Sequence, residues 1–355
     1  MKIAIVTDAW PPQVNGVVKT LSTTVAQLNS LGHEVLVVEP SQFATFPCPT
    51  YPEIRLAWRP GRRVNQLLRE FQPQALHIAT EGTLGLAARR WARAHKFTFT
   101  TSYHTQYPEY LRARWPIPVS VSYAFLRWFH GGAVRTMTAT PSLETRLRAN
   151  GFRNIVRWSR GVDLELFKPY GKEFLDFPRP IAIFVGRVAV EKNIEAFLKM
   201  NWDGTKVVVG DGPAREALQG QYPDAKFPGY QYGEELARHV AAADVFVFPS
   251  RTDTFGLVLL EAMACGTPIA AYPVMGPVDV VKRDVTGKLD ENLERAARSA
   301  LQLDPAQCRE HALRYTWSAA TEQFLRNLSP NLHFDWAAGR RRAGNAAALA
   351  DVREG

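Results

Sequence analysis

Short apolar runs rich in valine, isoleucine and phenylalanine alternate with amphipathic, helix-period segments along the first half of the chain. Continuous apolar runs of this length are typical of strands that are buried on both faces of a parallel sheet. The pattern predicts strands over residues 2–7, 34–39, 75–79, 97–102 and 136–140, and helices near 17–31, 63–71, 82–95, 119–133 and 142–149. Strands and helices that alternate in this way predict a doubly wound α/β domain.

The second half of the chain repeats this alternation. It predicts strands over 181–186, 206–210, 245–248 and 268–271, and helices near 192–200, 213–219, 233–242, 257–264 and 291–303. A stretch punctuated by glycine and proline, residues 160–169, reads as the linker between the halves. We therefore expect two Rossmann-like domains, residues 1–165 and 166–316, that face each other across a cleft.

A polar turn in the second half carries the main candidate chemistry. It follows the predicted strand 245–248, precedes the predicted helix 257–264, and is bracketed by two carboxylates, Asp253 and Glu261. Ligands of open α/β sheets bind at the carboxyl ends of strands, and free N–H groups at a helix start favour an anion there. Two plainer interpretations stay open: Asp253 and Thr254 cap the helix, and Glu261 is a solvated surface residue.

The order of residues in this turn is similar to a known motif. Two acids eight residues apart, around Thr254-Phe255-Gly256 and followed by Glu-Ala-Met-Ala-Cys-Gly-Thr-Pro, resemble the E-x7-E motif of retaining nucleotide-sugar glycosyltransferases of family 4. Those enzymes have the double-Rossmann GT-B fold. The first acid is Asp here, which keeps the charge but shortens its reach by one methylene. The resemblance covers nearly all of residues 1–330.

Two further loops match the family's donor site. The loop after the first strand contains Gly16 but lacks the G-x-G-x-x-G fingerprint, so a dinucleotide cofactor is disfavoured. Gly16 can be a simple turn residue, whereas the resemblance implies that it lies against the donor's diphosphate. Arg187 and Lys192 fall in a segment similar to the family's G-R-x-x-x-E-K-N element. An Arg and a Lys can neutralise a departing nucleoside diphosphate, although a surface Arg and a helix-start Glu-Lys pair would read the same way.

His104 follows the fourth predicted strand, in the sequence Tyr-His-Thr-Gln. A lone histidine at this place is compatible with a structural role. Enzymes of the resembled family carry His-Thr here, facing the donor sugar, so the resemblance implies that His104 orients that sugar by hydrogen bonding. The sequence contains no D-x-D triplet, no H-E-x-x-H and no close His/Cys cluster. We therefore expect no cofactor, and a leaving group that is stabilised without a metal ion.

Family membership implies a complete set of donor contacts. Arg187, Lys192 and the helix-start N–H groups would hold the diphosphate, Asp253 a sugar hydroxyl, and Glu261 the ribose hydroxyls. The acceptor hydroxyl would attack the anomeric carbon from the side that the diphosphate leaves, without a protein nucleophile. The donor-binding residues so predicted are Gly16, Arg187, Lys192, Asp253, Thr254, Phe255, Gly256, Leu257 and Glu261, and the catalytic ones His104, Arg187, Lys192 and Asp253.

Charge is distributed unevenly between the halves. Residues 1–165 contain 20 Lys and Arg against 10 Asp and Glu, and the remaining residues contain 23 against 24. A basic half suggests an anionic partner such as a membrane leaflet or a phosphorylated substrate, although an Arg-rich background composition would look alike. Nucleic acid is disfavoured because no recognised binding module occurs.

Basic and aromatic residues interleave between residues 111 and 133. A helix with a buried aromatic face would explain the pattern, but Trp and Arg are also favourable in the headgroup region of a membrane. Lipid glycosyltransferases of the family use a basic, apolar N-domain surface in this way. The predicted acceptor or membrane surface contains Arg112, Arg114, Trp115, Arg127 and Trp128.

The remaining composition limits the setting of the protein. At 355 residues and 46% hydrophobic content, the chain can bury two cores. Three widely spaced cysteines, a start without a signal sequence and no long apolar run predict a cytoplasmic protein, peripheral on the inner membrane face if it binds lipid. A monomer or weak dimer is expected. Residues 317–330 should form a helix that crosses back onto the first domain, by resemblance to GT-B enzymes, and residues 331–355 a weakly ordered tail.

Several alternatives stay open at this point. The acceptor can be a membrane lipid such as diacylglycerol, or a soluble or lipopolysaccharide-type glycan. A nucleotide-sugar epimerase or hydrolase of the same fold, or a catalytically weak binding module, would share most of the pattern. Nothing in residues 250–262 separates a UDP-linked from a GDP-linked donor.

Overall fold

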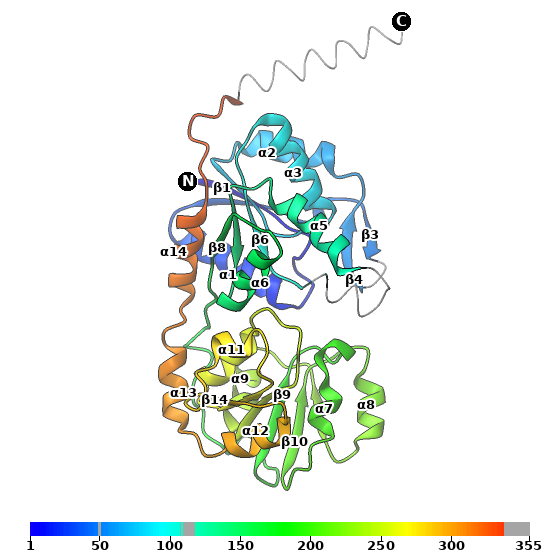
Figure 1. Ribbon diagram of the computed structural model, residues 1–355, viewed down its shortest axis with the longest axis vertical. Coiled ribbons are helices and arrows are strands. Elements are labelled where there is room, and N and C mark those ends of the chain that lie inside the picture. Colours follow the sequence, from blue (N-terminus) through cyan, green and yellow to red (C-terminus); the bar gives the residue numbers. More distant parts are fainter. Residues whose placement is uncertain (49–50, 107, 109–117, 337–355) are drawn as a thin grey trace, which may run out of the picture.

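The computed structural model describes residues 1–48, 51–106, 108 and 118–336, with the main chain only for 51–53. Two domains are stacked along the long axis of the molecule, and helices flank the sheet of each domain (Figure 1). Each sheet has six strands, and all of their neighbouring pairs are parallel. This arrangement confirms the predicted pair of doubly wound domains.

The first sheet has the spatial order β2-β1-β5-β6-β7-β8. Its strands are β1 (Lys2–Val6), β2 (Glu34–Val38), β5 (Ala75–Ile78), β6 (Thr100–Tyr103), β7 (Arg135–Thr138) and β8 (Ile155–Arg157). The helices are α1 (Gly16–Ser30), α2 (Gly61–Phe71), α3 (Thr83–His95), α5 (Val119–His130) and α6 (Pro141–Ala149), with a short 3-10 helix η1 (Pro40–Gln42). A separate antiparallel hairpin, β3 (Thr45–Cys48) and β4 (Tyr51–Ala57), follows η1.

The second sheet has the order β11-β10-β9-β12-β13-β14. Its strands are β9 (Ile181–Val185), β10 (Thr205–Val209), β11 (Lys226–Gly229), β12 (Val245–Phe248), β13 (Ile269–Ala271) and β14 (Gly287–Leu289). The helices are η2 (Val190–Lys192), α7 (Ile194–Leu198), α8 (Arg215–Gln221), α9 (Gly233–Ala242), α10 (Leu257–Ala264), α11 (Pro277–Val280), α12 (Leu293–Ala300) and α13 (Pro305–Ala312). β9 and β12 are completely buried, as their apolar runs predict.

Strand order reverses at one place in each sheet. In the second sheet the chain runs outward from β9 to β11, returns to the other side of β9 with β12, and continues outward to β14. The reversal in the first sheet lies between β1 and β5. The loops that leave two such strands diverge, and the space between them is where open α/β sheets bind ligands. The expected ligand positions are therefore the loops after β9 and β12, and those after β1 and β5.

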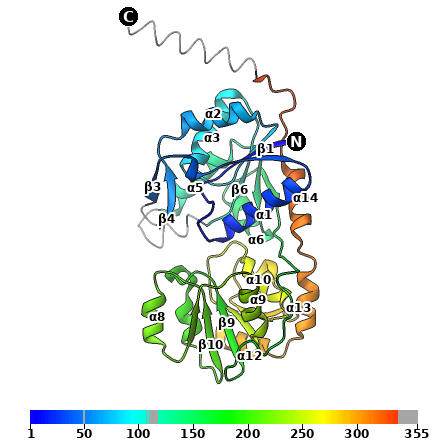
Figure 2. The same ribbon diagram turned by 180° about the vertical axis from the view of Figure 1, so that it is seen from behind.

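The chain passes between the domains twice, along one side of the molecule (Figures 1 and 2). Trp158 packs in the first domain, whereas Val162 and Phe167 pack in the second. On the return, α13 belongs to the second domain, and α14 (Trp317–Asn327) lies on the first, where Phe324 packs against Trp158 with ring centroids 4.9 Å apart. Hydrogen bonding between Val162 and Tyr315 joins the two passages.

Residues 331–336, which the sequence places at the start of a weakly ordered tail, dock on the first domain instead. Asn331 accepts a hydrogen bond from the Thr98 main chain at 2.8 Å. The Trp336 ring stacks on Trp91 at 5.9 Å, and Phe334 packs edge-on against Phe97 at 4.8 Å. Aromatic packing therefore holds residues 331–336 against the first domain. The polar composition of the surrounding sequence does not predict this contact. The rest of the predicted tail lies outside the described residues.

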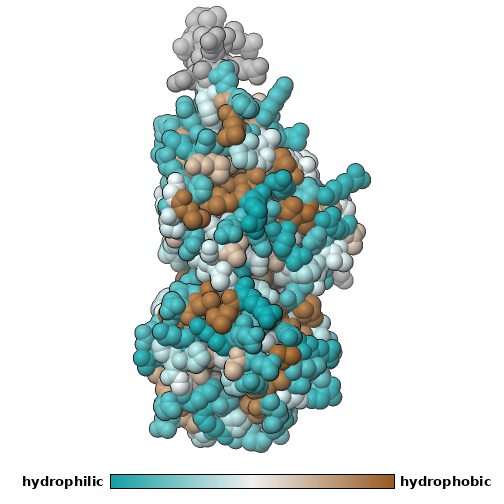
Figure 3. Space-filling model, turned by 90° about the vertical axis from the view of Figure 1, so that its left-hand side faces the viewer, coloured by the Kyte–Doolittle hydropathy of each residue, from teal (hydrophilic) through white to brown (hydrophobic). Residues whose placement is uncertain are grey.

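The surface over α13 and α14 is mostly hydrophilic, with apolar side chains in small separate patches (Figure 3). In the parts of the chain that the structure describes, no helix is long and apolar enough to cross a membrane.

Candidate active site

The polar turn predicted to carry the candidate chemistry comprises residues 249–256 and is called the acidic turn below. It lies where the strand order of the second sheet reverses, between the end of β12 and the start of α10. Gly256 begins the helix in the left-handed region, with φ 81°, and a Cβ there would come within 3.0 Å of Leu259. No side chain caps the helix, so Asp253 and Thr254 do not have the plain capping role. The first main-chain N–H groups of α10 are therefore left without a side-chain cap at a partly buried helix start, which favours an anion.

Lys192 and Asp253 meet across the reversal of the sheet. Lys192 ends η2, in the loop that follows β9, and its Nζ lies 2.6 Å from Oδ1 of Asp253. Asn193 adopts φ 53° and donates from its side chain to the main-chain oxygen of Pro249, which ties the two loops together. Arg187 lies in the same loop, five residues before Lys192, and its side chain is partly buried. The structure thus brings a cation and an anion of the predicted site into direct contact.

The acidic turn also gathers buried polar atoms that have no protein partner. Among the described residues, Ser250 Oγ, Thr252 Oγ1 and Asp253 Oδ2 are buried and make no hydrogen bond. Leaving a buried polar group unsatisfied costs about 1–3 kcal/mol, so such atoms are rare and seldom adjacent. Three of them within four residues indicate that a polar ligand completes this turn.

Glu261 lies on α10, about one helical turn after the helix start, and is partly buried. Its main-chain oxygen accepts from Cys265, but its carboxylate has no hydrogen bond or ion pair with the described residues. Burial raises the pKa of its carboxyl from the ordinary value to about 7, and the charge of Lys19 from α1 opposes this shift. Glu261 in turn contributes to the raised pKa of Tyr230, which follows β11 and is raised mainly by burial. A partly buried carboxylate without a side-chain partner is suited to accepting ligand hydroxyls.

The first domain closes directly on the acidic turn. Thr254 donates from Oγ1 to the main-chain oxygen of His104 at 2.8 Å. The Gln106 amide donates to the main-chain oxygen of Asp253 at 3.4 Å. At the other end of the turn, a Cβ on Gly16 would lie 3.6 Å from Leu257, so the first loop of the N-terminal domain faces the start of α10.

The ring of His104 is occupied within its own domain. Its Nδ1 accepts from the Arg160 guanidinium at 3.2 Å, which places the ring proton on Nε2, and Nε2 donates to Ser102 Oγ at 2.8 Å. Burial, together with the charge of Arg160, lowers the pKa of His104 well below its ordinary value, so the ring is neutral. A ring contact with a sugar would need one of these hydrogen bonds to exchange. That role of His104 stays a proposal.

Two of the predicted acceptor residues lie on α5, outside the contacts of the acidic turn described above. Arg127 and Trp128 lie on α5, where Arg127 donates to the main-chain oxygen of Asn150 and the Arg89 guanidinium stacks 3.8 Å from the Trp128 ring. Arg112, Arg114 and Trp115 lie outside the described residues. Within those residues, no three His, Cys, Asp or Glu side chains gather closely enough to hold a metal ion.

Two cavities lie at the opposite edge of the second sheet from the acidic turn. Their volumes are about 490 and 430 Å³, and they share Lys172 and Pro305 in their walls. Pro180, Asp244 and Pro268 in the larger one precede β9, β12 and β13. Because the amino ends of the strands meet there, these cavities are not where a doubly wound sheet binds its ligand.

Some residues of the site are absent from the sequence prediction. Lys19 stands one helical turn after Gly16, and this spacing alone could have placed it on the same face of α1. Ser250 and Thr252 lie inside the acidic turn itself. Arg160, at the start of the linker, contacts His104 at the end of β6. The two residues are far apart in the sequence, and no local pattern predicts their contact.

Comparison with known proteins assigns both halves of the chain. Residues 14–166 match the family described as Glycosyltransferase Family 4, and residues 179–303 match Glycosyl transferases group 1. A GDP-mannose-dependent alpha-mannosyltransferase of Mycobacterium tuberculosis is 31% identical over 315 residues, which are 81% of this chain and 83% of that protein.

Two further proteins are similar to the chain at lower identity. An alpha-monoglucosyldiacylglycerol synthase of Streptococcus pneumoniae is 26% identical, over 77% of this chain and 71% of that protein. Anabaena HepE, solved in complex with UDP and glucose, superimposes with a TM-score of 0.69 at 16% identity, over 92% of this chain and 98% of that one, and shares the fold. The chain therefore belongs to the retaining nucleotide-sugar glycosyltransferases of family 4 and has their GT-B fold.

Proposed function

We propose that this glycosyltransferase moves a hexose from a nucleotide diphospho-sugar to a hydroxyl group of a membrane lipid, with retention at the anomeric carbon. The observation that carries the proposal is the contact between Lys192 and Asp253 at the reversal of the second sheet, beside three buried polar atoms without a protein partner. A cation, a carboxylate and an uncapped helix start together match a ligand that carries both a diphosphate and hydroxyl groups.

Each part of the donor has a matching group. Lys192, Arg187 and the first N–H groups of α10 hold the diphosphate. Asp253 keeps Oδ1 on Lys192 and has Oδ2 free for a sugar hydroxyl, so the shorter Asp side chain is already fixed in place by the lysine. Glu261 accepts the ribose hydroxyls. Gly16, opposite Leu257, leaves room for the diphosphate because it has no side chain.

The chemistry of the step follows from these contacts. The bond between the anomeric carbon and the diphosphate oxygen breaks, and the acceptor oxygen forms its new bond on the same face of the sugar. The acceptor proton passes to the departing diphosphate oxygen. Negative charge grows on the diphosphate as it leaves, so preorganised cations and N–H dipoles lower the barrier without a protein nucleophile.

A thermal-shift panel tests the donor site. The similarity to a GDP-mannose-dependent enzyme makes GDP-mannose the first donor to try, followed by GDP, UDP, UDP-glucose and ADP, each with EDTA present. A ligand that binds only the native state stabilises it by RT ln(1 + [L]/Kd), about 2.7 kcal/mol at 100 times Kd. We expect one nucleotide to raise the melting temperature by several degrees. No shift with any of them would mean that the acidic turn is scaffolding.

The acceptor side is supported by an exposed apolar face on α5. Val121, Phe125 and Trp128 are 59%, 42% and 53% exposed and stand four and three residues apart, which puts them on one side of the helix. The domain that carries α5 also holds the whole excess of positive charge. Exposed aromatic side chains in a basic surface favour the headgroup region of an anionic membrane. The similarity to an alpha-monoglucosyldiacylglycerol synthase of Streptococcus pneumoniae supports a lipid acceptor.

Vesicle binding tests the α5 face. Replacing Phe125 and Trp128 with alanine should weaken co-sedimentation with vesicles of phosphatidylglycerol and phosphatidylcholine by about tenfold or more, because two apolar rings lose their place in the interface. Leu313→Ala, at a site that is 48% exposed between α13 and α14, is the matched control. Equal binding by both variants and the wild type would remove α5 from the membrane surface.

A further inference from the structure

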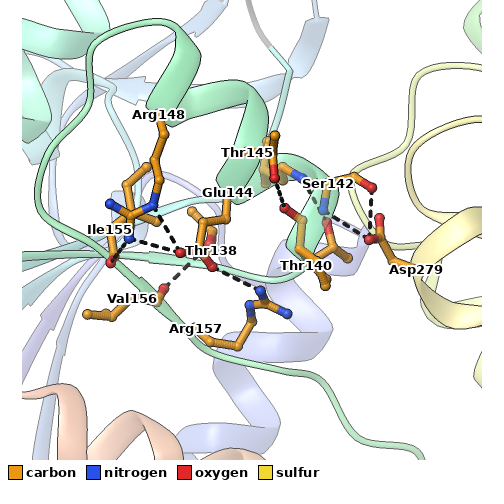
Figure 4. A network of polar contacts seen from close by, with 12 residues as sticks. Thr138, Thr140, Ser142, Glu144, Thr145, Arg148, Ile155, Val156, Arg157 and Asp279 are labelled. Carbon is orange, nitrogen blue, oxygen red and sulfur yellow. Dashed lines mark hydrogen bonds and ion pairs between the residues drawn. The ribbon is translucent and has the colours of Figure 1, made fainter.

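A second contact joins the two domains outside the donor residues, between α6 and α11. Asp279 of α11 accepts two hydrogen bonds through Oδ1, from the main-chain N–H of Ser142 and from its hydroxyl, both at 2.9 Å. Figure 4 shows the two side chains pointing at one another from their separate domains. Ser142 lies in the first turn of α6, so a carboxylate of the second domain occupies the N-terminus of a helix of the first.

α6 is fixed firmly to its own domain. Glu144 accepts from Arg157 on β8 and from Arg148 one turn along the helix, each at 2.9 Å. Arg148 also donates to the main-chain oxygen of Ile155. These contacts surround α6 in Figure 4. These hydrogen bonds join α6 to β8, the edge strand of the first sheet.

On the other side, Asp279 is linked to the acidic turn through a short loop. Gly276 precedes α11 with φ 92°, and a Cβ there would lie 3.1 Å from the main-chain oxygen of Asp253 and 3.3 Å from that of Phe255. Met275, next to it, packs against the apolar cluster under α6. The positive φ and the close approach to the turn both favour glycine here. The loop before α11 thus packs directly on the acidic turn.

The N-terminus of α6 touches the acidic turn directly as well. Thr140 caps α6 by accepting from the main chain of Leu143, and its hydroxyl donates to the main-chain oxygen of Thr254 at 3.3 Å. One helix start of the first domain therefore contacts both Asp279 and the turn that carries Asp253. These contacts exist only when the two domains are together.

We propose that Asp279 and Ser142 form an interdomain latch, which holds the domains closed and positions the acidic turn for the donor. Asp279 and Ser142 are positioning residues, since neither faces the predicted donor. The effect on the donor rests on the function proposed above, whereas the effect on domain closure does not. A donor that binds the closed form has an apparent affinity reduced by the fraction of molecules that are closed.

The test compares Asp279→Ala, Ser142→Ala and the double variant with wild type. Alanine is used because an asparagine oxygen could accept the same two hydrogen bonds. Losing a helix-terminal cap to alanine should lower the closed-to-open ratio by about two- to thirtyfold. Small-angle scattering of the ligand-free protein should then report a larger radius of gyration. At saturating acceptor, the donor KM should rise severalfold while kcat changes less than twofold. The double variant should match Asp279→Ala within error, since both changes break the same contact.

Asp224→Ala is the matched control, because Asp224 is an exposed carboxylate of the same domain outside this contact. A variant that merely folds poorly would lower kcat per molecule, leave KM unchanged, and show a lower melting temperature. Unchanged scattering and an unchanged donor KM in Asp279→Ala would overturn the latch. If Asp279→Ala opens the protein but the wild type transfers no sugar, the latch stands and the proposed function is refuted.

Discussion

Replacing Lys192 with alanine is expected to lower turnover by about 10²–10³-fold, which is the usual effect of removing one preorganised group that stabilises transition-state charge. The reason lies in its position: Lys192 Nζ is held 2.6 Å from Asp253 Oδ1, and the lysine side chain is only 22% exposed, so its charge acts in a partly desolvated setting. Single-turnover measurements with saturating donor and acceptor would isolate the chemical step from binding.

The effect should fall mainly on kcat rather than on the donor KM. The negative charge on the diphosphate is larger when the glycosidic bond is breaking than in the bound donor, so Lys192 contributes more to the transition state than to the ground state. Loss of Lys192 also leaves Asp253 without its partner, which disturbs the sugar contact. Lys192→Arg, which keeps the charge, should retain more activity than Lys192→Ala.

Lys199→Ala is the matched control, because Lys199 is an exposed lysine that pairs with Glu195 one turn away on the same domain. We expect it to keep wild-type turnover, since exposed pairs contribute little. Lys192→Ala with activity within twofold of wild type would show that Lys192 has no part in stabilising the leaving group.

The sequence predicts those elements of the fold that carry a strong local signal. Each predicted strand and helix corresponds to an element of the structure, with ends that shift by a few residues where side chains intervene. The fourth strand is predicted from residue 97 but begins at Thr100, because Phe97 ends α3 by bonding to Ala92 and Thr98 bonds to Asn331. A contact more than 200 residues away in the chain leaves no mark in the local pattern.

Elements with weak apolar patterns were not predicted. β8, β11 and β14 are edge or near-edge strands of three or four residues, two of them containing glycine, and the β3–β4 hairpin contains prolines. Such strands are specified by their neighbours in the sheet rather than by their own composition. α13, with charged residues in its short length, is held by its packing on α10.

The candidate site likewise has one part that local sequence patterns predict and one part that they do not. Its second-domain part, from Arg187 to Glu261, follows directly from loops at the carboxyl ends of two strands, so a short motif and the strand order suffice to assemble it. The first-domain part depends on how the domains meet. The hydrogen bond between Thr254 and His104, the approach of Lys19 to Glu261 and the pairing of Ser142 with Asp279 arise between segments that no local spacing connects.

Glu261 makes donor binding depend on pH. Burial raises the pKa of its carboxyl to about 7, so the folded protein holds a proton there that the unfolded chain, near the ordinary value of 4.5, has released. Stability associated with Glu261 is therefore complete below about pH 4.5 and is lost as pH rises toward 7. Ribose hydroxyls donate to the ionised form, so donor binding should strengthen over that same upper range, with release of a proton.

Glu261→Gln should consequently separate stability from function. An amide cannot ionise, so the variant avoids the cost of a buried charge. After allowance for solvent screening, we expect the variant to be more stable than the wild type at pH 8 by about 1–2 kcal/mol. Its melting temperature should then be a few degrees higher. That difference should shrink toward zero near pH 4.5. Donor affinity at pH 8 should fall by about 10–100-fold, because hydrogen bonds to a charged acceptor contribute about 1.5–3 kcal/mol.

Calorimetric titration of the donor between pH 5.5 and 8, with melting curves over pH 4.5 to 8, measures both effects in the same proteins. Glu216→Gln, at an exposed position in the first turn of α8, is the control and should change neither the stability nor the affinity. In the wild type, affinity should rise across pH 7 and level off, whereas in Glu261→Gln it should be flat. A Glu261→Gln protein that binds the donor as tightly as the wild type at pH 8 would exclude Glu261 from the donor site. If Glu261→Gln binds the donor unchanged and also melts at a higher temperature, Glu261 is a carboxylate that only destabilises the fold. The free-energy cost of its burial would then not be offset by any contact with the ligand.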